Sequence, residues 1–371
     1  MKNYKGVLGI NLLNFNSDKL AGAGYFIKRI FYQLQLENFN KRIVIFVPNN
    51  LDVSKVFDLD CNKLDFEIVK IAGINSFIKR IIFEQTLFIS YLRKLDYYYS
   101  PTPALPILLK VFLPNIKSIV TIHDLIPFYF PKKYPFFRRL YVKLITKLGA
   151  KFADTIITVS KSTKKDLISH FDISHDKIVI VYNFIPELIK EEESIINKYF
   201  VTVSTIEPGK NLINIIKAFY EFQRSDKGKD FLFYICGKDG WDSKNIYSLV
   251  DELGLQDKIV FTGYLEEDKK NDLIKGSYAM IYVSFYEGFG IPPLEAMYYS
   301  KPSIVSNNSS LPEVVGLTGL LCNPNNSVEI CSAMKEMLLQ RSSLIKNIPS
   351  QLEFFDPSKQ LEIFINAIYV K

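Results

Sequence analysis

Short apolar runs rich in β-branched residues alternate with longer amphipathic segments along the whole chain. In the first half the apolar runs are GVLGINLL, RIVIFV, DFEIVK, YYYS, SIVTIHDL, TIITVS and KIVIVYN. In the second half they are FVTVST, FLFYICG, IVFTGY, AMIYVS, PSIVSN and GLLCNP. Such runs predict buried strands, and the amphipathic segments between them, among them 25–37 and 135–151, predict the crossover helices of parallel sheets. The pattern therefore predicts an α/β protein built from doubly wound, Rossmann-like sheets.

The two series of strands indicate two domains. The chain has 371 residues, which is too many for one ordinary hydrophobic core. A polar, acidic stretch at 186–198, PELIKEEESIINK, separates the series and is interpreted as a linker. We therefore expect an N-terminal domain over 1–185, a C-terminal domain over 199–352 and a terminal segment over 353–371. In that last segment Asp356 and Pro357 predict the N-cap and first residue of a helix.

Composition favours a folded protein of a reducing compartment. Hydrophobic residues make up 48% of the chain and charged residues 23%. No apolar run reaches the roughly 18 residues that a membrane-spanning helix needs, and the N-terminus lacks the pattern of a signal peptide. The four cysteines have no paired spacing typical of a metal or redox motif. A cytoplasmic location is expected from these features.

The net charge of +7 is concentrated in one segment, 132–151. This segment carries seven lysines and arginines and no acid, interleaved with aromatic and aliphatic residues. A basic amphipathic helix of this kind predicts peripheral contact with an anionic membrane surface. The alternative is a core-packing helix whose basic residues form a solvated face. Nucleic-acid binding is disfavoured, because no recognised nucleic-acid motif accompanies the segment.

Candidate chemistry lies where predicted strands end, since ligands of doubly wound sheets bind at the carboxyl ends of the strands. Gly22 and Gly24 open a helical segment, where glycines allow close approach of a ligand to the backbone. The third glycine of a dinucleotide fingerprint is replaced by Ile27, which disfavours a nicotinamide-dependent dehydrogenase. The alternative for this loop is an ordinary turn with a glycine preference.

Two further strand ends carry titratable groups. His123 could hydrogen-bond a substrate hydroxyl, with Asp124 orienting its ring, or the two could form a satisfied loop pair. Lys210 follows the turn at Pro208 and Gly209 and opens a helix, an arrangement that suits a phosphate. The alternative for Lys210 is an exposed lysine without a ligand.

The stretch SFYEGFGIPPLEAM is the most informative of these strand ends. Glu287 lies just after a predicted strand, and Gly288 and Gly290 free backbone N–H groups behind it. Two prolines then suit the first turn of a helix that contains Glu295. Carboxylates accept hydrogen bonds from sugar hydroxyls, and a helix N-terminus favours an anion, so the stretch predicts a site for a polyhydroxylated, phosphorylated ligand. Glu295 could instead only stabilise the helix dipole.

At these residues the chain resembles the retaining, group 1 (family 4) glycosyltransferases of the GT-B fold. EGFGIPPLEA is similar to their E-x7-E motif, with Glu287 and Glu295 as its glutamates. Other segments in matching order are HDLIPFYFP, ADTIITVSKSTKKDL, STIEPGKNL, CGKDGW and LPEVVG. The resemblance covers nearly the whole chain and is weakest from about 35 to 95. It implies two Rossmann-like domains facing a cleft, with the C-terminal helix crossing back to the N-terminal domain.

The resemblance also implies roles for individual residues. Glu295 would bind the ribose and Lys210 the diphosphate of a nucleotide sugar, while His123 would lie near the donor sugar. Glu287 would hold the transferred sugar together with the backbone of Gly288, Phe289, Gly290 and Ile291. Gly263 and Tyr264 would border the nucleobase. Gly22 and Gly24 would lie near the acceptor. No cofactor and no metal are expected. Asp58 and Asp60, although spaced like a metal-binding Asp-x-Asp, are interpreted as unrelated to catalysis.

Two departures from the family pattern stand out. Gly209 occupies the position where many relatives have an arginine, and Ser204 does not restore that charge; Lys238 is a candidate substitute. Phe184 replaces a residue that is commonly glycine and would shape the joint between the domains.

The implied function is transfer of a hexose from a nucleoside diphosphate sugar to a lipid-linked saccharide in surface polysaccharide or glycoconjugate biosynthesis. GDP-mannose is favoured over a UDP-hexose as donor. The reaction would take place at the inner face of the cytoplasmic membrane. The alternatives are another GT-B enzyme, such as a sugar-nucleotide epimerase or a phosphorylase, and a non-catalytic membrane-associated scaffold.

Overall fold

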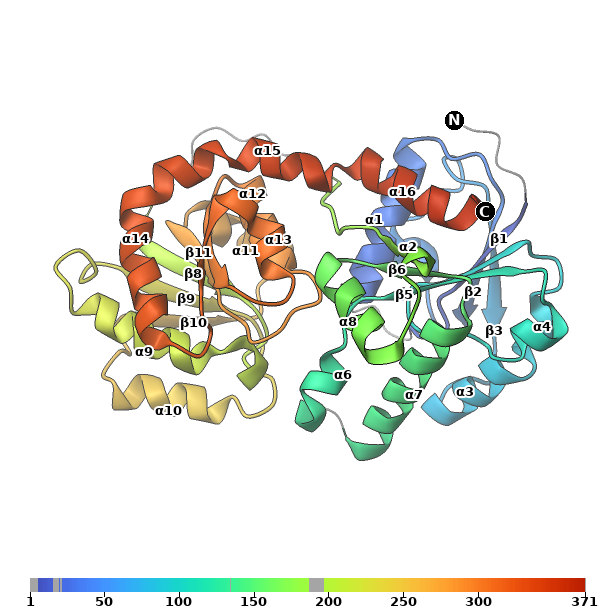
Figure 1. The fold of residues 1–371 in the computed structure, drawn as a ribbon, viewed down its shortest axis with the longest axis horizontal. Coiled ribbons are helices and arrows are strands. Elements are labelled where there is room, and N and C mark those ends of the chain that lie inside the picture. Colours follow the sequence, from blue (N-terminus) through green and yellow to red (C-terminus); the bar gives the residue numbers. More distant parts are fainter. Residues whose placement is uncertain (1–5, 16–19, 21, 134, 187–196, 371) are drawn as a thin grey trace. The chain divides into compact units, whose positions relative to one another are not determined.

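The computed structural model describes residues 6–15, 20, 22–133, 135–186 and 197–370. The chain divides into two compact units (Figure 1). The N-terminal unit comprises Met1–Pro186 together with Asp356–Lys371, and the C-terminal unit comprises Glu187–Phe355. Most of the predicted linker, 187–196, lies outside the described residues.

The N-terminal unit is built on a seven-stranded parallel sheet with the order β3-β2-β1-β4-β5-β6-β7. Its strands are β1 (Leu8–Asn11), β2 (Ile43–Pro48), β3 (Phe66–Ile71), β4 (Tyr97–Ser100), β5 (Lys117–Ile122), β6 (Thr155–Thr158) and β7 (Ile178–Ile180). All seven fall within or next to the apolar runs that predicted them. The strand order reverses between β1 and β4, which makes the ends of these two strands the switch point of the sheet.

Helices lie between the strands of this unit. They are α1 (Gly22–Leu36), α2 (Val53–Phe57), α3 (Phe77–Gln85), α4 (Phe88–Tyr91), α5 (Leu109–Phe112), α6 (Ile126–Tyr129), α7 (Phe136–Phe152) and α8 (Lys161–Phe171). Helix α8 begins where the sequence provides a cap, because Ser160 Oγ accepts a hydrogen bond from Thr163 N at 3.0 Å. The strands of this sheet are largely buried, with Ile10, Tyr98 and Ile119 completely inaccessible.

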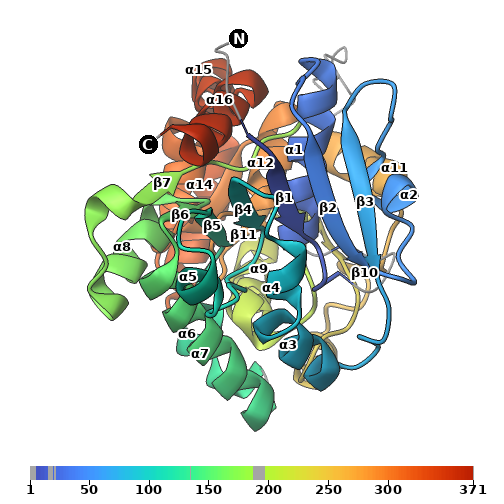
Figure 2. The same ribbon diagram turned by 90° about the vertical axis from the view of Figure 1, so that its right-hand side faces the viewer.

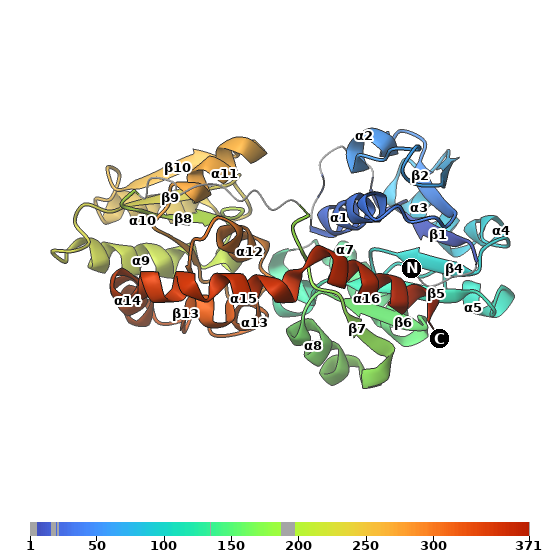
Figure 3. The same cartoon turned by 90° about the horizontal axis from the view of Figure 1, so that it is seen from above.

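The last helix, α16 (Pro357–Tyr369), belongs to the N-terminal unit although it follows the C-terminal unit in sequence. It packs against α1 and against β4 to β7 (Figure 3). Asp356 caps it through a hydrogen bond from Lys359 N at 2.8 Å, and Pro357 is its first residue, as predicted. The buried rings of Phe364 and Tyr99 meet edge to face at 5.1 Å. The expected return of the C-terminal helix to the N-terminal unit is confirmed.

The C-terminal unit has a six-stranded parallel sheet with the order β10-β9-β8-β11-β12-β13. The strands are β8 (Tyr199–Val203), β9 (Leu232–Cys236), β10 (Ile259–Gly263), β11 (Ala279–Tyr282), β12 (Ser303–Ser306) and β13 (Gly319–Cys322). The helices are α9 (Leu212–Gln223), α10 (Lys244–Glu252), α11 (Glu267–Lys275), α12 (Ile291–Tyr298), α13 (Leu311–Val315), α14 (Ser327–Lys346) and α15 (Ile348–Leu352). The strand order reverses between β8 and β11, so the loops after these strands flank the second switch point.

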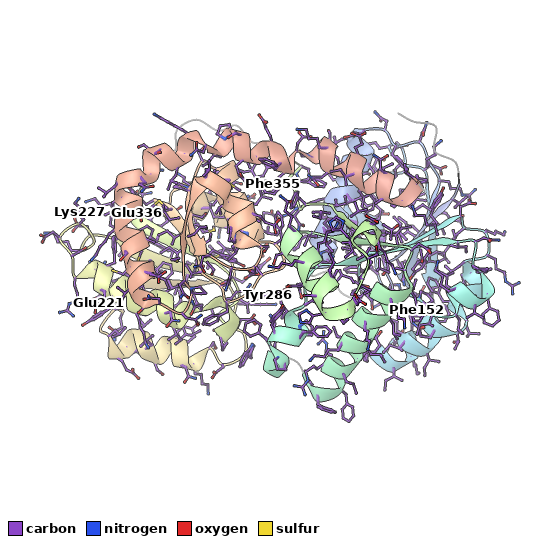
Figure 4. All side chains as sticks on the ribbon, viewed as in Figure 1. Phe152, Glu221, Lys227, Tyr286, Glu336 and Phe355 are labelled. Atoms are coloured by element: carbon purple, nitrogen blue, oxygen red, sulfur yellow. The ribbon has the colours of Figure 1, made fainter. Side chains whose placement is uncertain are left out.

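The boundary near the C-terminus differs from the expected one at 353. Residues Glu353–Phe355 form a 3₁₀ turn that belongs to the C-terminal unit. The ring of Phe355, labelled in Figure 4, is buried and packs edge to face on Phe289 at 5.7 Å. This aromatic contact holds the turn on the C-terminal unit, and the chain passes to the N-terminal unit only at Asp356. In the described part of the chain, no helix combines the length and apolarity required to cross a bilayer.

Candidate active site

The loops after β8 and β11 are joined across the switch point of the C-terminal unit. Phe285 N donates to Gly209 O at 3.1 Å. Asn211, whose φ of 59° lies in the left-handed region that asparagine tolerates, donates from Nδ2 to Val283 O at 2.9 Å and to Pro324 O at 2.7 Å. Because Asn211 is buried, these bonds fix the start of α9 against the end of β11. They bring the residue before Asn211, Lys210, next to the loop that carries Glu287.

Lys210 and Glu287 form an ion pair at this position. Lys210 Nζ donates to Glu287 Oε1 at 2.6 Å and to the hydroxyl of Tyr282 at 3.1 Å. The two charged side chains are only 18% and 10% exposed. Burial opposes the charge on Lys210, but the Glu287 carboxylate and the Tyr282 hydroxyl raise the pKa of Lys210 above its ordinary value. The lysine is therefore a permanent cation at the switch point, and it is not the exposed lysine that was the alternative.

The loop after β12 holds the Glu287 loop in place. Ser309 Oγ accepts from Glu287 N at 3.2 Å, and Ser310 Oγ donates to Glu287 O at 3.0 Å. Asn308 Nδ2 donates to Phe285 O at 3.1 Å. Glu287 is therefore fixed through its backbone on both sides, which leaves its carboxylate oriented toward Lys210.

Gly290 sets the start of α12. Its φ of 122° is strained for any residue with a side chain, and a Cβ atom here would lie 2.7 Å from Leu311 Cδ2. Pro292 and Pro293 occupy the first turn of α12 and have no N–H groups, so the Ile291 amide is the one donor of the first three helical residues. The Phe289 side chain points into the core, against Phe355. Of the residues expected at the transferred sugar, Phe289 and Ile291 can thus contribute their backbone.

Glu295 also forms an ion pair with a lysine of another helix. Lys270 Nζ, on α11, donates to Glu295 Oε1 at 2.9 Å, and the two side chains are 17% and 12% exposed. The two glutamates of the E-x7-E motif therefore each pair with a lysine from another element, Glu287 with Lys210 and Glu295 with Lys270. This pairing shows that Glu295 does more than face the dipole of its own helix. One carboxylate oxygen is oriented by the lysine, which leaves the other for a ligand hydroxyl.

The loop after β10 presents an aromatic ring. Gly263 has a φ of 67°, and its carbonyl accepts from Gly237 N at 2.9 Å. The next residue, Tyr264, is 67% exposed. A planar ring at a strand end can stack on a nucleobase. The nearby loop after β9 lies beside the lysine loop, since Ile206 N donates to Lys238 O at 3.0 Å, and the side chain of Lys238 is exposed.

Gly209 has room for a side chain. The nearest atom to a Cβ built at this position is Glu207 Oε1 at 3.7 Å, an ordinary van der Waals distance. The backbone of Gly209 also lies outside the left-handed region. Neither packing nor backbone conformation therefore requires glycine where relatives have an arginine.

His123 and the glycine loop lie in the N-terminal unit. The His123 ring donates from Nε2 to the carbonyl oxygen of Pro101 at 3.0 Å and meets Phe26 edge to face at 5.3 Å. Because a carbonyl only accepts, the proton of the neutral ring is on Nε2. Burial lowers the pKa of His123 to about 4, although the Pro101 carbonyl opposes this shift. Asp124 Oδ1 accepts from Ile126 N at 2.9 Å and thereby closes the next turn.

Gly22 and Gly24 have different environments. A Cβ at Gly24 would lie 2.7 Å from Leu20 Cδ2, whereas Gly22 faces open space. Close packing of the chain before α1 therefore accounts for Gly24, and Gly22 remains a candidate contact for a ligand. Residues 16–19 and 21, which complete this loop, lie outside the described residues.

The aspartates of the Asp-x-Asp pattern have local structural roles. Asp58 pairs with Lys28 Nζ at 2.6 Å, and Asp60 Oδ1 accepts from Asn62 N at 2.9 Å. Among the residues that the structure describes, no three His, Cys, Asp or Glu side chains cluster closely enough to hold a metal ion.

Helix α7 does not bury the apolar residues of its N-terminal half. Phe136, Phe137, Leu140 and Leu144 are 62%, 83%, 57% and 53% exposed. Its buried residues, Thr146, Gly149 and Ala150, lie toward the C-terminus, where Gly149 approaches the Pro103 carbonyl so closely that a Cβ would be 2.4 Å away. The alternative of a core-packing helix with a solvated basic face is therefore wrong for the N-terminal half.

Sequence analysis missed Tyr282, Lys270 and the loop Asn308–Ser310. Lys270 lies on a helix crowded with charges, and only its distance to Glu295 distinguishes it from its neighbours. The contacts of Asn211 were not predicted either. A polar residue directly after a conspicuous lysine, in a turn that needs a positive φ, is a usable signal for such a clamp.

Comparisons with known proteins identify the family of the chain. Residues 186–350 match the family described as glycosyl transferases group 1, and residues 74–187 match glycosyltransferase family 4. The chain is 28% identical over 327 residues to the O-antigen chain mannosyltransferase RfbU of Salmonella typhimurium (strain LT2), covering 84% of this chain and 90% of that protein. It is 30% identical over 261 residues to the O-antigen chain mannosyltransferase B of Escherichia coli, covering 67% of this chain and 66% of that protein.

The fold is shared with solved structures. The crystal structure of Anabaena Alr3699/HepE in complex with UDP and glucose superposes with a TM-score of 0.73 at 17% identity, covering 97% of this chain and 98% of that chain. The expected fold class is thereby confirmed, and so is the expected family. The chain belongs to the group 1 glycosyltransferases and has the GT-B fold.

Proposed function

We propose that this glycosyltransferase moves a hexosyl group from a nucleoside diphosphate sugar to a saccharide acceptor, with retention of anomeric configuration. The observation that carries the proposal is the Lys210–Glu287 ion pair at the switch point of the C-terminal unit. It offers a fixed cation for a diphosphate and, next to it, a carboxylate for sugar hydroxyls.

In the proposed reaction the bond between the anomeric carbon and the diphosphate breaks, and the acceptor hydroxyl attacks from the same face. A phosphate oxygen of the departing diphosphate takes the proton of that hydroxyl. Lys210 stabilises the charge that develops on the diphosphate, which is the contribution expected of a preorganised cation. Because Lys210 supplies this charge, we propose that no metal ion is required.

The remaining contacts of the donor follow from the strand ends. Glu295, oriented by Lys270, holds the ribose hydroxyls, and Tyr264 borders the nucleobase. Glu287 and the backbone of Gly288 to Ile291 hold the transferred sugar. His123 acts from the N-terminal unit as a neutral hydrogen-bonding group near that sugar.

The relatives support a donor and a pathway class. RfbU and the E. coli relative are named as O-antigen chain mannosyltransferases, which favours GDP-mannose and a role in surface polysaccharide synthesis. The HepE structures contain UDP, which keeps a UDP-hexose as the second candidate. We propose a lipid-linked acceptor and a peripheral position at the inner face of the cytoplasmic membrane, supported by the exposed apolar residues of α7 among its lysines and arginines.

Calorimetric titration with a panel of GDP- and UDP-sugars tests the proposal. One member of the panel should bind, and Lys210→Ala should abolish that binding. Hydrolysis or transfer should then continue in EDTA. Absence of binding across the panel would exclude the transferase reaction. Epimerisation of the donor without any acceptor, or turnover that needs inorganic phosphate, would favour an epimerase or a phosphorylase.

A further inference from the structure

The switch point of the N-terminal unit opens into a cavity of about 850 Å³. Asn14, shortly after β1, and Thr102, shortly after β4, form its base and are joined by a hydrogen bond of 3.0 Å from Asn14 Nδ2 to Thr102 Oγ1. Helices α3 and α7, whose places in the N-terminal unit can be seen in Figure 2, both contribute residues to its lining. Their rings Phe77 and Tyr141 meet edge to face at 4.8 Å. The cavity therefore lies where a doubly wound sheet binds its ligand.

The wall on the α7 side of this cavity is mainly apolar, although it also contains Arg138. It includes Phe137, which is 83% exposed, together with Tyr141, Val142 and Ile145. Phe77 of α3 is 44% exposed on the other side. An apolar wall that includes side chains as exposed as Phe137 and Phe77 fits a ligand that has an apolar part of its own.

Arg80 introduces a positive charge into the same cavity. Its side chain is 13% exposed, and its guanidinium carbon lies 5.3 Å from the centre of the Phe77 ring. Its Nε lies 3.8 Å from Glu84 Oε2, which is close enough for attraction but too long for a hydrogen bond. Both atoms are buried without a hydrogen-bond partner in the part of the chain that the structure describes. A ligand in the cavity can reach the exposed part of the Arg80 side chain, whereas the buried Nε faces Glu84.

Glu84, the acidic neighbour of Arg80, is itself fixed by a buried hydrogen bond. Its residue is 1% exposed, and Oε1 accepts from Asn11 Nδ2 at 3.2 Å. Asn11, the last residue of β1, also donates to the Tyr98 hydroxyl at 2.9 Å. Burial raises the pKa of Glu84, against the effects of Arg80 and Asn11. Asn11, Tyr98 and Glu84 thus form a buried polar network next to the Arg80 side chain that lines the cavity.

The charge of the cavity is one-sided. Arg80 and Arg138 are among the side chains that line it, and none of the lining side chains that the structure describes is acidic. A planar guanidinium presents donors that match two oxygens of a phosphate at once. The combination of this charge with the apolar wall of α7 fits a phosphate attached to an apolar chain.

We propose that this cavity binds the phosphate through which the acceptor saccharide is joined to an apolar chain. Arg80 holds the phosphate, Phe137, Tyr141 and Val142 contact the first part of the apolar chain, and Asn14 and Thr102 face the saccharide. The proposal rests on the proposed function, because the ligand is the acceptor of that reaction. The proposed membrane contact of α7 would thus include a defined binding site, to which α3 also contributes residues.

Three small probes separate these contacts: a hexosyl phosphate esterified with an eight-carbon alcohol, the matching eight-carbon hexoside without phosphate, and free hexose 1-phosphate. Each is titrated below its micelle concentration into the full chain and into variants. Arg80→Gln should weaken binding of the esterified phosphate about 10- to 100-fold and leave the uncharged hexoside unchanged. Arg93→Gln, an exposed arginine of the same unit outside the cavity, is the matched control and should change neither.

Phe137→Ser provides an independent test, because a residue that is 83% exposed can be replaced without loss of the fold. It should weaken both eight-carbon probes several-fold and leave hexose 1-phosphate unchanged. Arg80→Lys, which keeps the charge above Glu84, should recover part of the binding that Arg80→Gln loses. Equal losses for the charged and uncharged probes in Arg80→Gln, or unchanged binding in Phe137→Ser, would overturn the proposal.

Donor titration on the same proteins distinguishes this inference from the proposed function. If nucleotide sugars bind and the esterified phosphate does not, the inference fails and the proposed function stands. If the esterified phosphate binds in an Arg80-dependent manner and no nucleotide sugar binds, the cavity is a site for that ligand but the transferase reaction fails.

Discussion

The ammonium group of Lys210 lies 2.6 Å from Glu287 Oε1, and the two residues come from opposite sides of the switch point between β8 and β11. The pair balances its own charge in the free enzyme. If the proposed donor binds here, its diphosphate will compete with Glu287 for Lys210, and the hydroxyls of its sugar will replace the hydrogen bond that Glu287 then loses. Diphosphate and sugar are expected to bind more tightly as one molecule than either part alone.

Lys210→Met should destabilise the C-terminal unit by about 3 kcal/mol, because it leaves the Glu287 carboxylate buried without its partner. The double variant Lys210→Met with Glu287→Leu should regain much of this free energy of unfolding, since no unpaired charge remains. Urea denaturation of the three proteins measures the difference. Donor binding should be lost in the single and in the double variant alike.

The exposed pair Lys198 and Asp230, with side chains 66% and 60% exposed, provides the control for this experiment. Lys198→Met should change the free energy of unfolding by less than about 1 kcal/mol. A Lys210→Met variant as stable as this control would show that the Lys210–Glu287 pair contributes little to the fold.

Gly209→Arg should increase the affinity for a nucleoside diphosphate about 10- to 100-fold, because it adds a charge-assisted hydrogen bond beside Lys210. The position has room for the side chain and an ordinary backbone conformation. Calorimetry with GDP and UDP measures the gain, and Gly209→Ala is the control for the loss of glycine. Unchanged or weaker binding in Gly209→Arg would mean that the guanidinium turns to Glu207 instead.

Glu295→Ala should weaken nucleoside diphosphate binding about tenfold if the carboxylate accepts from ribose hydroxyls. The same variant should bind a 2′,3′-dideoxynucleoside diphosphate as well as the unchanged protein does, since that ligand has no hydroxyls to donate. Parallel titrations with both ligands measure the difference. A similar loss for the two ligands would assign Glu295 to orienting Lys270 rather than to the ribose.

The fold was predictable because most strands are buried apolar runs, and the edge strands β3, β10 and β13, which are only partly buried, are still predominantly apolar in sequence. YYYS at 97–100 and AMIYVS at 279–284 contain β4 and β11 almost to the residue. Asp356 and Pro357 predict the start of α16 for the same reason, since a cap is a local signal.

The candidate site was predictable only in part, because its contacts are made by single polar residues far apart in sequence. Lys270 lies 25 positions before Glu295, and Asn211 donates to a carbonyl 72 positions away. Neither pairing produces any periodicity. The cavity beside Arg80 was missed as well, because it depends on α3 and α7 coming together.

His123 should remain neutral throughout the physiological range, with a titration midpoint near pH 4 in NMR spectra of the ring. Its folded pKa lies below the ordinary value of about 6.5, so the unfolded chain binds the proton more readily. Stability from this group is present above pH 6.5 and is lost as the pH falls from 6.5 toward 4. His123→Gln should reduce the slope of unfolding free energy against pH in that window. An unchanged slope would contradict the burial of the ring.

Phe136→Ser combined with Leu140→Ser should reduce partitioning onto anionic vesicles at least about tenfold, because the two side chains bring exposed apolar surface to the bilayer. Binding by the unchanged protein should weaken as salt is added. Co-sedimentation with phosphatidylglycerol vesicles measures both effects. Leu339→Ser, at a residue of α14 that is 73% exposed, should have no effect. Equal partitioning of all three proteins would remove α7 as the membrane contact.

Because α16 belongs to the N-terminal unit but ends the chain, the N-terminal unit is completed last during synthesis. A ribosome completes β1 to β7 first, but the ring of Phe364, which packs on Tyr99, emerges only after the whole C-terminal unit. Until then the face of the sheet that α16 occupies stays uncovered on the nascent chain. A chain truncated just before residue 356 would therefore lack the helix that completes the N-terminal unit, and it would expose the rings of Tyr97 and Tyr99 to proteases and to aggregation.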